Sequence, residues 1–218
     1  MNKMKASIIL NCLIFLMVIF ATVVMMTGFE FMAHETPMTA TKLSVFQFFT
    51  VDSNILVGIG SLLLMIEEIL SLKKKREIKK FYFVFKYLGV VSVLLTLIVT
   101  ACFLAPFSIF GFFAFYQNSN LFFHFLIPVV SVISFVFFDR CLLSFRDTFY
   151  SIIPMACYAI YYMGRVLPHV QDGKVSYTYD FYGFLRGGVY AIIYVVPIIF
   201  LLTYAIGFLV FLIHKKIK

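Results

Sequence analysis

Residues 6–28 read ASIILNCLIFLMVIFATVVMMTG, an apolar run without a charged side chain that follows a short basic segment, residues 1–5. A helix needs about 20 apolar residues to cross the hydrocarbon core of a bilayer. The run exceeds the apolar core of a signal peptide, which is about 7–15 residues long, and no small-x-small cleavage site follows it. We therefore predict that residues 6–28 form a membrane-spanning helix.

Five more apolar runs of similar length follow along the 218-residue chain, at about 46–70, 82–106, 120–139, 148–167 and 189–213. The composition agrees, because 63% of residues are hydrophobic and 13% are charged, whereas soluble domains are nearer half apolar and about a quarter charged. This composition excludes a disordered chain, a disulfide scaffold and a nucleic-acid-binding arm. We predict an all-α protein with one domain, residues 1–218, that forms a bundle of six transmembrane helices.

The basic residues predict how the bundle is oriented, because cytoplasmic loops of membrane proteins carry an excess of Lys and Arg. With the N-terminus in the cytoplasm, 14 of the 18 basic residues lie on the cytoplasmic side. They are Lys3, Lys5, Lys73, Lys74, Lys75, Arg76, Lys79, Lys80, Lys86, Arg140, Arg146, Lys215, Lys216 and Lys218, and the outer side holds Lys42, Arg165, Lys174 and Arg186. Both termini are therefore predicted to be cytoplasmic. The run 73–80 is mainly a topology signal, although it could also bind anionic lipid headgroups.

The richness in Phe, Ile and Lys without Trp is typical of an AT-rich bacterial genome, so we expect a bacterial plasma-membrane protein. No cofactor or metal is expected. The four cysteines fall in spans or at the inner boundary, with no C-x-x-C motif or Cys/His cluster. A transmembrane haem needs paired histidines, and His124 is the only histidine within a predicted span.

Polar side chains in two predicted spans mark the candidate site, because polar groups are costly in hydrocarbon. Thr50 in the second span and His124 in the fourth each lie about four residues past the predicted outer start of their helix, roughly 6 Å deep. A small and polar stripe on the second span should face protein and comprises Thr50, Ser53, Asn54, Val57, Gly58 and Ser61. On the fourth span, Asn120 and His124 share a face, and Pro128 frees the carbonyl of His124.

Simpler roles for these residues stay open at this stage. The Thr50 hydroxyl could bond the carbonyl four residues earlier, Asn54 could join two helices, and His124 could bond a nearby carbonyl. Asp139 and Arg140 at the inner boundary are expected to pair or to reach toward the interface. Glu67 and Glu68, just before the basic run, are expected to be solvated.

The strings Phe49-Thr50-x-x-Ser53-Asn54 and His124-x-x-x-Pro128 resemble signatures of a six-pass membrane family, the androgen-induced and androgen-dependent hydrolases of animals and their bacterial relatives. The animal members are threonine hydrolases that cleave fatty acid esters of hydroxy fatty acids. The resemblance implies that Thr50 and His124 form the catalytic pair. One departure is that Ser134-Phe135 stands where bacterial relatives often carry an acidic residue, and the acid here comes later, at Asp139.

The chemistry that the resemblance implies is general-base catalysis of ester cleavage. Neutral His124 would take the proton of the Thr50 hydroxyl, and the oxygen would form an acyl-threonine. Asn54 could donate its amide to the developing oxyanion, and Asn120 or Asp52 could orient the imidazole. Ser53 belongs to the same supporting group, and Asp52 is the weaker candidate because it lies on nearly the opposite side of the helix from Thr50.

The surroundings of the pair suit a membrane lipid or another lipophilic ester. Phe123 and Phe125 flank His124, the uncharged loop 107–119 could cover a cavity, and Arg165 or Arg186 in the last outer loop could bind a carboxylate. Two alternatives remain: a substrate-binding membrane subunit of a small-molecule importer, and a lipid acyltransferase. Nothing in the sequence identifies a protein partner.

Overall fold

The computed structural model describes residues 3–32, 37–176, 178–185 and 187–217, and most of them are helical. The α-helices are α1 (Lys3–Thr27), α2 (Phe49–Lys74), α3 (Lys80–Val99), α4 (Asn118–Leu121), α5 (Ile127–Ile133), α6 (Asp147–Tyr150), α7 (Ile153–Val166) and α8 (Ile192–Ile217). Short 3₁₀ helices cover Lys42–Gln47, Ala105–Phe107, Phe112–Tyr116, Leu167–His169 and Val189–Ala191, and π-helical turns cover Thr100–Leu104, Phe122–Leu126 and Ser134–Phe138. The strands β1 (Val170–Gln171) and β2 (Lys174–Val175) form a small antiparallel hairpin in which Val170 pairs with Val175.

The fold is all-α, as predicted, and within the described residues five helical segments are long and apolar enough to cross a membrane. They are Lys3–Thr27, Phe49–Lys74, Lys80–Phe107, Asn118–Phe138 and Val189–Ile217. Apolar side chains also cover the outside of the bundle, and Ile160 and Ile193 are 75% and 74% exposed. Such a surface suits contact with lipid.

The segment predicted as a helix over 148–167 differs from the other five. It is divided into α6 and α7, and α7 has 14 residues, about 21 Å at 1.5 Å per residue. This length is less than the hydrocarbon thickness of about 30 Å. Pro154 explains the break, because proline lacks an N–H and disfavours helical geometry in the preceding residue. The helix therefore restarts at Ile153, with the proline in its first turn.

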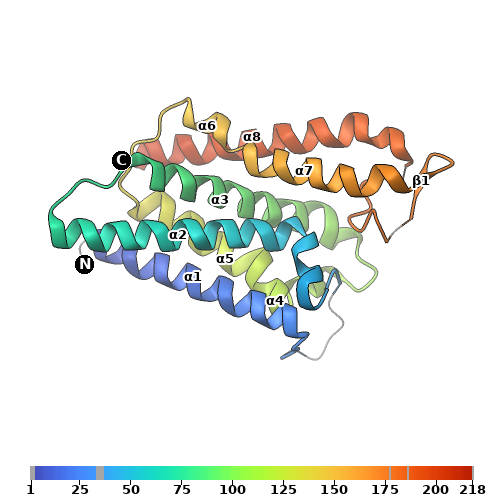
Figure 1. Cartoon of the computed structure of the whole chain (residues 1–218), viewed down its shortest axis with the longest axis horizontal. Coiled ribbons are helices and arrows are strands. Elements are labelled where there is room, and N and C mark those ends of the chain that lie inside the picture. Colours follow the sequence, from blue (N-terminus) through green and yellow to red (C-terminus); the bar gives the residue numbers. More distant parts are fainter. Residues whose placement is uncertain (1–2, 33–36, 177, 186, 218) are drawn as a thin grey trace.

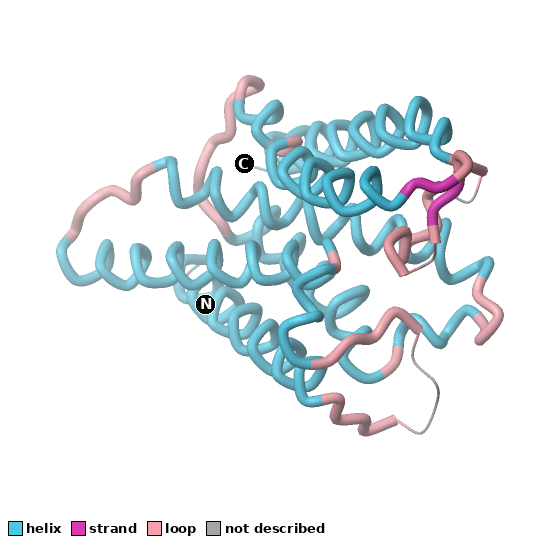
Figure 2. Tube along the Cα trace, turned by 45° about the vertical axis from the view of Figure 1, so that its right-hand side comes forward, coloured by secondary structure: helices cyan, strands magenta, loops and turns pink. Residues whose placement is uncertain are grey.

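The long helices lie side by side, with both termini at one end of the bundle (Figure 1). We call this the terminal end, which also holds the turn 75–79, and we call the opposite end the distal end, which holds the loops 28–48 and 167–191 (Figures 1 and 2). Helix α2 lies between α1 and α3. The bundle thus places the starts of α2 and α4 at the distal end, where the sequence predicts the site.

Close packing of α2 against α3 depends on two glycines. A Cβ atom at Gly89 would lie 2.5 Å from Cα of Val57, and one at Gly60 would lie 2.9 Å from Cα of Lys86. Small residues allow membrane helices to approach in this way. The polar stripe of α2 is accordingly buried between helices, except that Thr50 is only half-buried.

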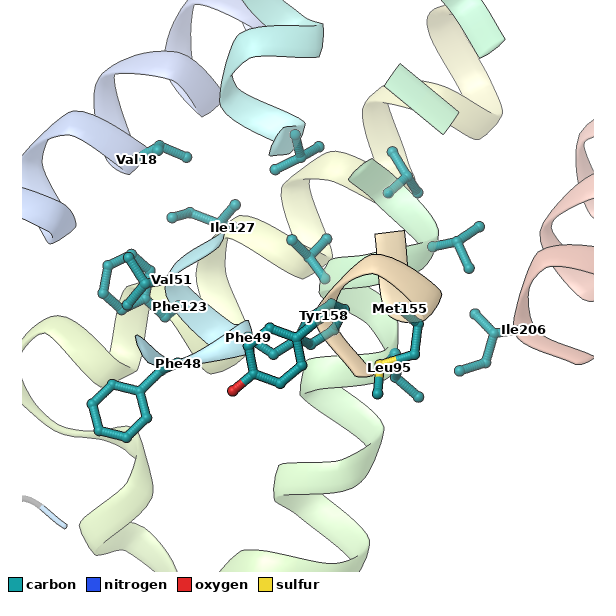
Figure 3. Packing of buried hydrophobic residues seen from close by; sticks show 14 of the residues in the cluster. Val18, Phe48, Phe49, Val51, Leu95, Phe123, Ile127, Met155, Tyr158 and Ile206 are labelled. Atoms are coloured by element: carbon teal, nitrogen blue, oxygen red, sulfur yellow. The ribbon is translucent and has the colours of Figure 1, made fainter. Parts of the chain in front are cut away.

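The fourth apolar segment is irregular where it carries His124. The turn Phe122–Leu126 is π-helical and Pro128 follows it. A proline cannot donate to the carbonyl four residues earlier, and a π-turn accommodates this missing bond. Below it, Phe123 and Ile127 enter the hydrophobic core beside Val51 of α2 and Val18 of α1 (Figure 3). The irregular turn thus carries His124 beside a well-packed core.

Candidate functional site

A large cavity of about 1030 Å³ opens at the distal end of the bundle. Its walls are mainly apolar and aromatic and come from the end of the third apolar segment, the loops that follow α3 and β2, and the first half of α8. The cavity wall includes Phe48, Phe103, Phe115, Phe181, Tyr182 and Ile198. Cavities of this size and character are typical of sites for small apolar ligands.

Thr50 lines a smaller pocket of about 40 Å³ that adjoins the large cavity. The two share wall residues, namely Val99, Leu104, Tyr182, Phe184 and Ile199. Three other hydroxyl-bearing residues, Thr96, Thr100 and Tyr158, also line the small pocket, although its surface is almost entirely apolar. Thr50 is therefore one layer of side chains away from an apolar cavity.

Thr50 is the second residue of α2, closer to the helix start than the sequence predicts. The helix begins three residues after the predicted start near residue 46, because residues 42–47 form a 3₁₀ helix and Phe48 is extended. The carbonyl of Thr50 accepts hydrogen bonds from Ser53 Oγ at 3.0 Å and from Asn54 Nδ2 at 2.7 Å. Among the described residues, its hydroxyl makes no hydrogen bond to the carbonyl of Phe46.

Tyr182, in the loop before α8, caps the N-terminus of α2. Its hydroxyl accepts the N–H of Phe49 at 2.9 Å, one of the amides that a helix start leaves without a partner. The same hydroxyl interacts with those of Tyr158 and Thr50. Burial raises the pKa of Tyr182 to about 12, although these hydrogen bonds lower it, so the phenol remains a hydrogen-bond donor at neutral pH.

His124 is 3% exposed and held in one orientation. Its Nδ1 atom lies 2.7 Å from the carbonyl oxygen of Phe115. A carbonyl only accepts hydrogen bonds, so Nδ1 carries a proton, and in a neutral imidazole Nε2 would keep its lone pair. The side chain of Phe115 lines the large cavity. His124 therefore lies behind the wall of this cavity.

Asn54 joins the two segments that carry the predicted pair. Its amide Nδ2 donates to the carbonyl of Thr50 and, at 3.2 Å, to the carbonyl of Phe123, which precedes His124. Among the described residues, no hydrogen bond joins the side chains of Thr50 and His124. Both amide hydrogens of Asn54 are engaged, so this geometry assigns it to positioning and leaves none for the predicted oxyanion contact.

The other predicted supporting residues point elsewhere. Asn120 donates to the carbonyl of Pro37 at 3.0 Å and so fixes a loop that lines the large cavity. Ser53 lies 3.2 Å from Thr96 Oγ1 on α3. Asp52 lines a different cleft, of about 350 Å³, together with residues of α7. In this structure, none of the three is hydrogen-bonded to the His124 imidazole.

The predicted substrate-binding residues are dispersed. Phe123 is buried in the core (Figure 3), and Phe125 is 46% exposed on the outside of the bundle. Arg165 lies over the ring of Phe181, 5.4 Å from its centroid, and donates to the carbonyl of Thr178 at 3.4 Å. Both partners of Arg165 line the large cavity. Arg186 lies outside the described residues.

The hydroxyl groups around Thr50 are the part of the site that the sequence analysis missed. Thr96 and Thr100 are four residues apart in an otherwise apolar span, a spacing that places both on one helix face. Tyr182 belongs to the aromatic run Tyr179-Asp180-Phe181-Tyr182. Nothing in that run indicates that the loop folds back onto α2.

A second polar cluster lies toward the terminal end. Lys86 Nζ and Asp139 Oδ2 are 2.7 Å apart, and both side chains are fully buried. Asp139 thus pairs with a lysine of α3. Glu68 is 2% exposed, so the expectation that it is solvated is wrong. It is Glu67 that faces the surface, where it pairs with Arg76 at 2.6 Å.

The described residues contain no group of three or more His, Cys, Asp or Glu side chains arranged to hold a metal ion. Comparisons of the chain with protein-family models, characterised proteins and solved structures found no match. The functional assignment therefore depends on the geometry of the distal end and on the two motifs at Thr50 and His124.

Proposed function

We propose that this chain is an intramembrane lipid-ester hydrolase in which Thr50 is the nucleophile and His124 is the base. In this proposal the bundle has six transmembrane helices, and the segment 148–167, which contains α7, is the short fifth span. Both termini are cytoplasmic, the membrane is a bacterial plasma membrane, and the site opens in the outer leaflet. The observation that carries the proposal is the position of Thr50, in a small pocket that shares wall residues with an apolar cavity of about 1030 Å³.

The cavity suits an acyl chain. It is large enough for a lipid tail, and its walls provide aromatic and aliphatic side chains. An ester whose acyl chain fills this cavity would have its carbonyl near the mouth of the Thr50 pocket. A fatty acid ester of a hydroxy fatty acid would also present a carboxylate, and Arg165 behind the wall is the nearest described cation to Phe181 and Thr178.

In the proposed reaction, Nε2 of His124 removes the Thr50 hydroxyl proton while the oxygen attacks the ester carbonyl. The tetrahedral intermediate collapses to an acyl-threonine, and the alcohol leaves with the proton from His124. Water then attacks the acyl-threonine and gives up a proton to His124, and His124 returns that proton to the Thr50 oxygen as the acid is released. The two side chains would meet directly or through one water, since catalytic hydrogen bonds often tighten only in the substrate complex.

Tyr182 takes the role of oxyanion donor in this scheme. Its hydroxyl interacts with that of Thr50, and it already accepts the N–H of Phe49, so its own proton is available for an acceptor in the pocket. Asn54 holds the backbones of Thr50 and Phe123 in register. It therefore acts as a positioning residue.

The test is labelling of the purified protein in detergent by a lipophilic fluorophosphonate, with Thr50→Val and His124→Ala beside the wild type. We expect the wild type to be labelled at Thr50 and both variants to lose the label. Thr96→Val is the matched control, because it removes a hydroxyl from the same pocket and should keep the label. A folded wild type that resists the lipophilic probe would contradict the proposal.

A second candidate is a substrate-binding membrane subunit. The observation in its favour is that the Thr50 hydroxyl interacts with Tyr182, while His124 bonds the Phe115 carbonyl. Such a protein would bind a lipophilic ligand with these hydroxyls and release it unchanged. Product analysis by mass spectrometry after incubation with a fatty acid ester separates the two, and an ester product in place of a free acid would indicate an acyltransferase.

A further inference from the structure

The buried polar cluster toward the terminal end takes no part in the site proposed at the distal end. It joins α1, α2, α3 and the end of the fourth apolar segment through six buried side chains: Ser7, Asn11, Glu68, Lys86, Ser134 and Asp139. Glu68 lies six residues before the end of α2, about 9 Å along the helix. The cluster is therefore within reach of the terminal end but sealed by side chains.

The charges of this cluster do not balance if every group is ionised. Lys86 Nζ contacts Asp139 Oδ2 and donates to Ser134 Oγ, both at 2.7 Å, so these two charges neutralise each other. Glu68 then remains as a second carboxyl, for which Lys86 and Asp139 are the charged neighbours. An unpaired buried carboxylate is very costly, and such groups are normally neutral.

The neighbours on the other elements add no positive charge. From α1, Asn11 and Ser7 face Glu68, and both are uncharged. On α2 itself, Glu67 turns to Arg76 at the surface. From α8, His214 stacks on Phe135 and contacts the carbonyl of Cys141.

The hydrogen bonds indicate where a proton would lie. Asn11 Nδ2 donates to Glu68 Oε2 at 3.3 Å and to Ser7 Oγ at 3.2 Å. Ser7 Oγ donates a hydrogen bond to Asp139 Oδ1 at 2.9 Å. The amide oxygen of Asn11 is buried and has no donor among the described residues. A protonated Glu68 carboxyl supplies such a donor beside it, and an amide and a carboxylic acid can pair through two hydrogen bonds.

We propose that Glu68 is a proton-binding site: its carboxyl holds one proton in the folded protein, paired with the Asn11 amide beside the Lys86–Asp139 ion pair. The inference is independent of the hydrolase assignment, because the cluster shares no residue with the Thr50 pocket. It gives the protein a second intramembrane site whose ligand is a proton drawn from the terminal-end solution.

The experiment uses dicyclohexylcarbodiimide, which adds to protonated carboxyl groups in apolar surroundings to give a stable acylurea. The full-length protein is labelled in detergent and its peptides are assigned by mass spectrometry. We expect the label on Glu68 and not on Glu67, with less label as the pH rises. Glu68→Gln should lose the label, and the matched variant Glu67→Gln should keep it.

Infrared spectroscopy of the wild type gives a second readout that needs no variant to fold. The carboxylic-acid C=O band should be present at neutral pH and shift in D₂O, and it should persist in Glu67→Gln. A folded wild type with neither the label on Glu68 nor the band would overturn the proposal. Protection of Glu68 by sodium ions at constant pH would also overturn it, because it would show a metal cation in place of the proton.

Discussion

Tyr182 is the side chain on which the proposed chemistry and the local fold both depend. Tyr182→Phe keeps the ring and removes the hydroxyl that accepts the Phe49 N–H and interacts with Thr50. Loss of one oxyanion donor lowers kcat by about 10²–10³-fold in known hydrolases, and an amide left without a partner costs about 1–3 kcal/mol. We expect both effects, measured as ester turnover and as the free energy of unfolding.

The control for this prediction is Tyr179→Phe. Tyr179 lies in the same loop, but its ring stacks on His169 at the surface, so its hydroxyl should affect neither quantity. A Tyr182→Phe protein with unchanged turnover would remove Tyr182 from the proposed mechanism and leave it as a structural residue.

Helical spacing predicts a shared depth for Thr50 and His124, but it does not predict which groups surround them. The amide of Asn54 donates hydrogen bonds to the carbonyls of both Thr50 and Phe123. This contact is compatible with the shared depth expected of Thr50 and His124. Helical spacing carries that information because it is local. Helical spacing carries no information about Tyr182, because the position of this residue depends on how a loop distant in sequence folds. Glu68 was misjudged for the same reason, since only the packing of α1 distinguishes it from Glu67.

The contact between α2 and α3 predicts a sharp response to one added methyl group. In Gly89→Ala the new Cβ would lie 2.5 Å from Cα of Val57, so the two helices must separate. Overpacking of this kind costs about 1–3 kcal/mol. The free energy of unfolding in detergent should fall by that amount.

Gly164→Ala is the matched control, because a Cβ there meets nothing within 4 Å. Alanine is favoured over glycine inside a helix by about 0.5–1 kcal/mol, so this variant should be neutral or slightly more stable. Equal destabilisation by both substitutions would show that the α2–α3 contact at Gly89 has room for a methyl group.

The start of α3 is tied to the start of α6 by Lys80 and Asp147, whose charged atoms are 2.5 Å apart. Burial alone would raise the pKa of Asp147, but the hydrogen bonds from Lys80 and Ser144 outweigh it and lower the pKa from 3.8. A lowered folded-state pKa contributes stability that is complete above the unfolded-state value and is lost as the pH falls through the folded-state value.

Asp147→Asn should therefore lower Tm at neutral pH, and the difference from wild type should shrink as the pH drops below about 3.9, the ordinary aspartate pKa. Thermal unfolding of both proteins across this pH range measures it. A Tm difference that stays constant into strong acid would contradict an ionic role for this contact.

The length and apolar character of five segments were readable from sequence because each run is long enough to span a membrane whatever it packs against. The sixth was not, since composition alone does not show that α7 restarts at Ile153 behind Pro154. A helix of about 21 Å crosses about 30 Å of hydrocarbon only if α6 and the turn that joins it to α7 complete the path. The number of spans is thus the fold-level statement most in need of a direct test.

Cysteine accessibility supplies that test at the level of the whole molecule. In a background with the four native cysteines replaced, Lys174→Cys in the hairpin and Lys75→Cys after α2 place thiols at opposite ends of the bundle (Figure 1). With cytoplasmic termini, a membrane-impermeant maleimide added to intact cells should label the hairpin thiol and not the other. Permeabilised cells should label both equally. Labelling of Lys75→Cys alone would invert the orientation and move the Thr50 cavity to the inner leaflet, while labelling of both in intact cells would contradict the six-span arrangement.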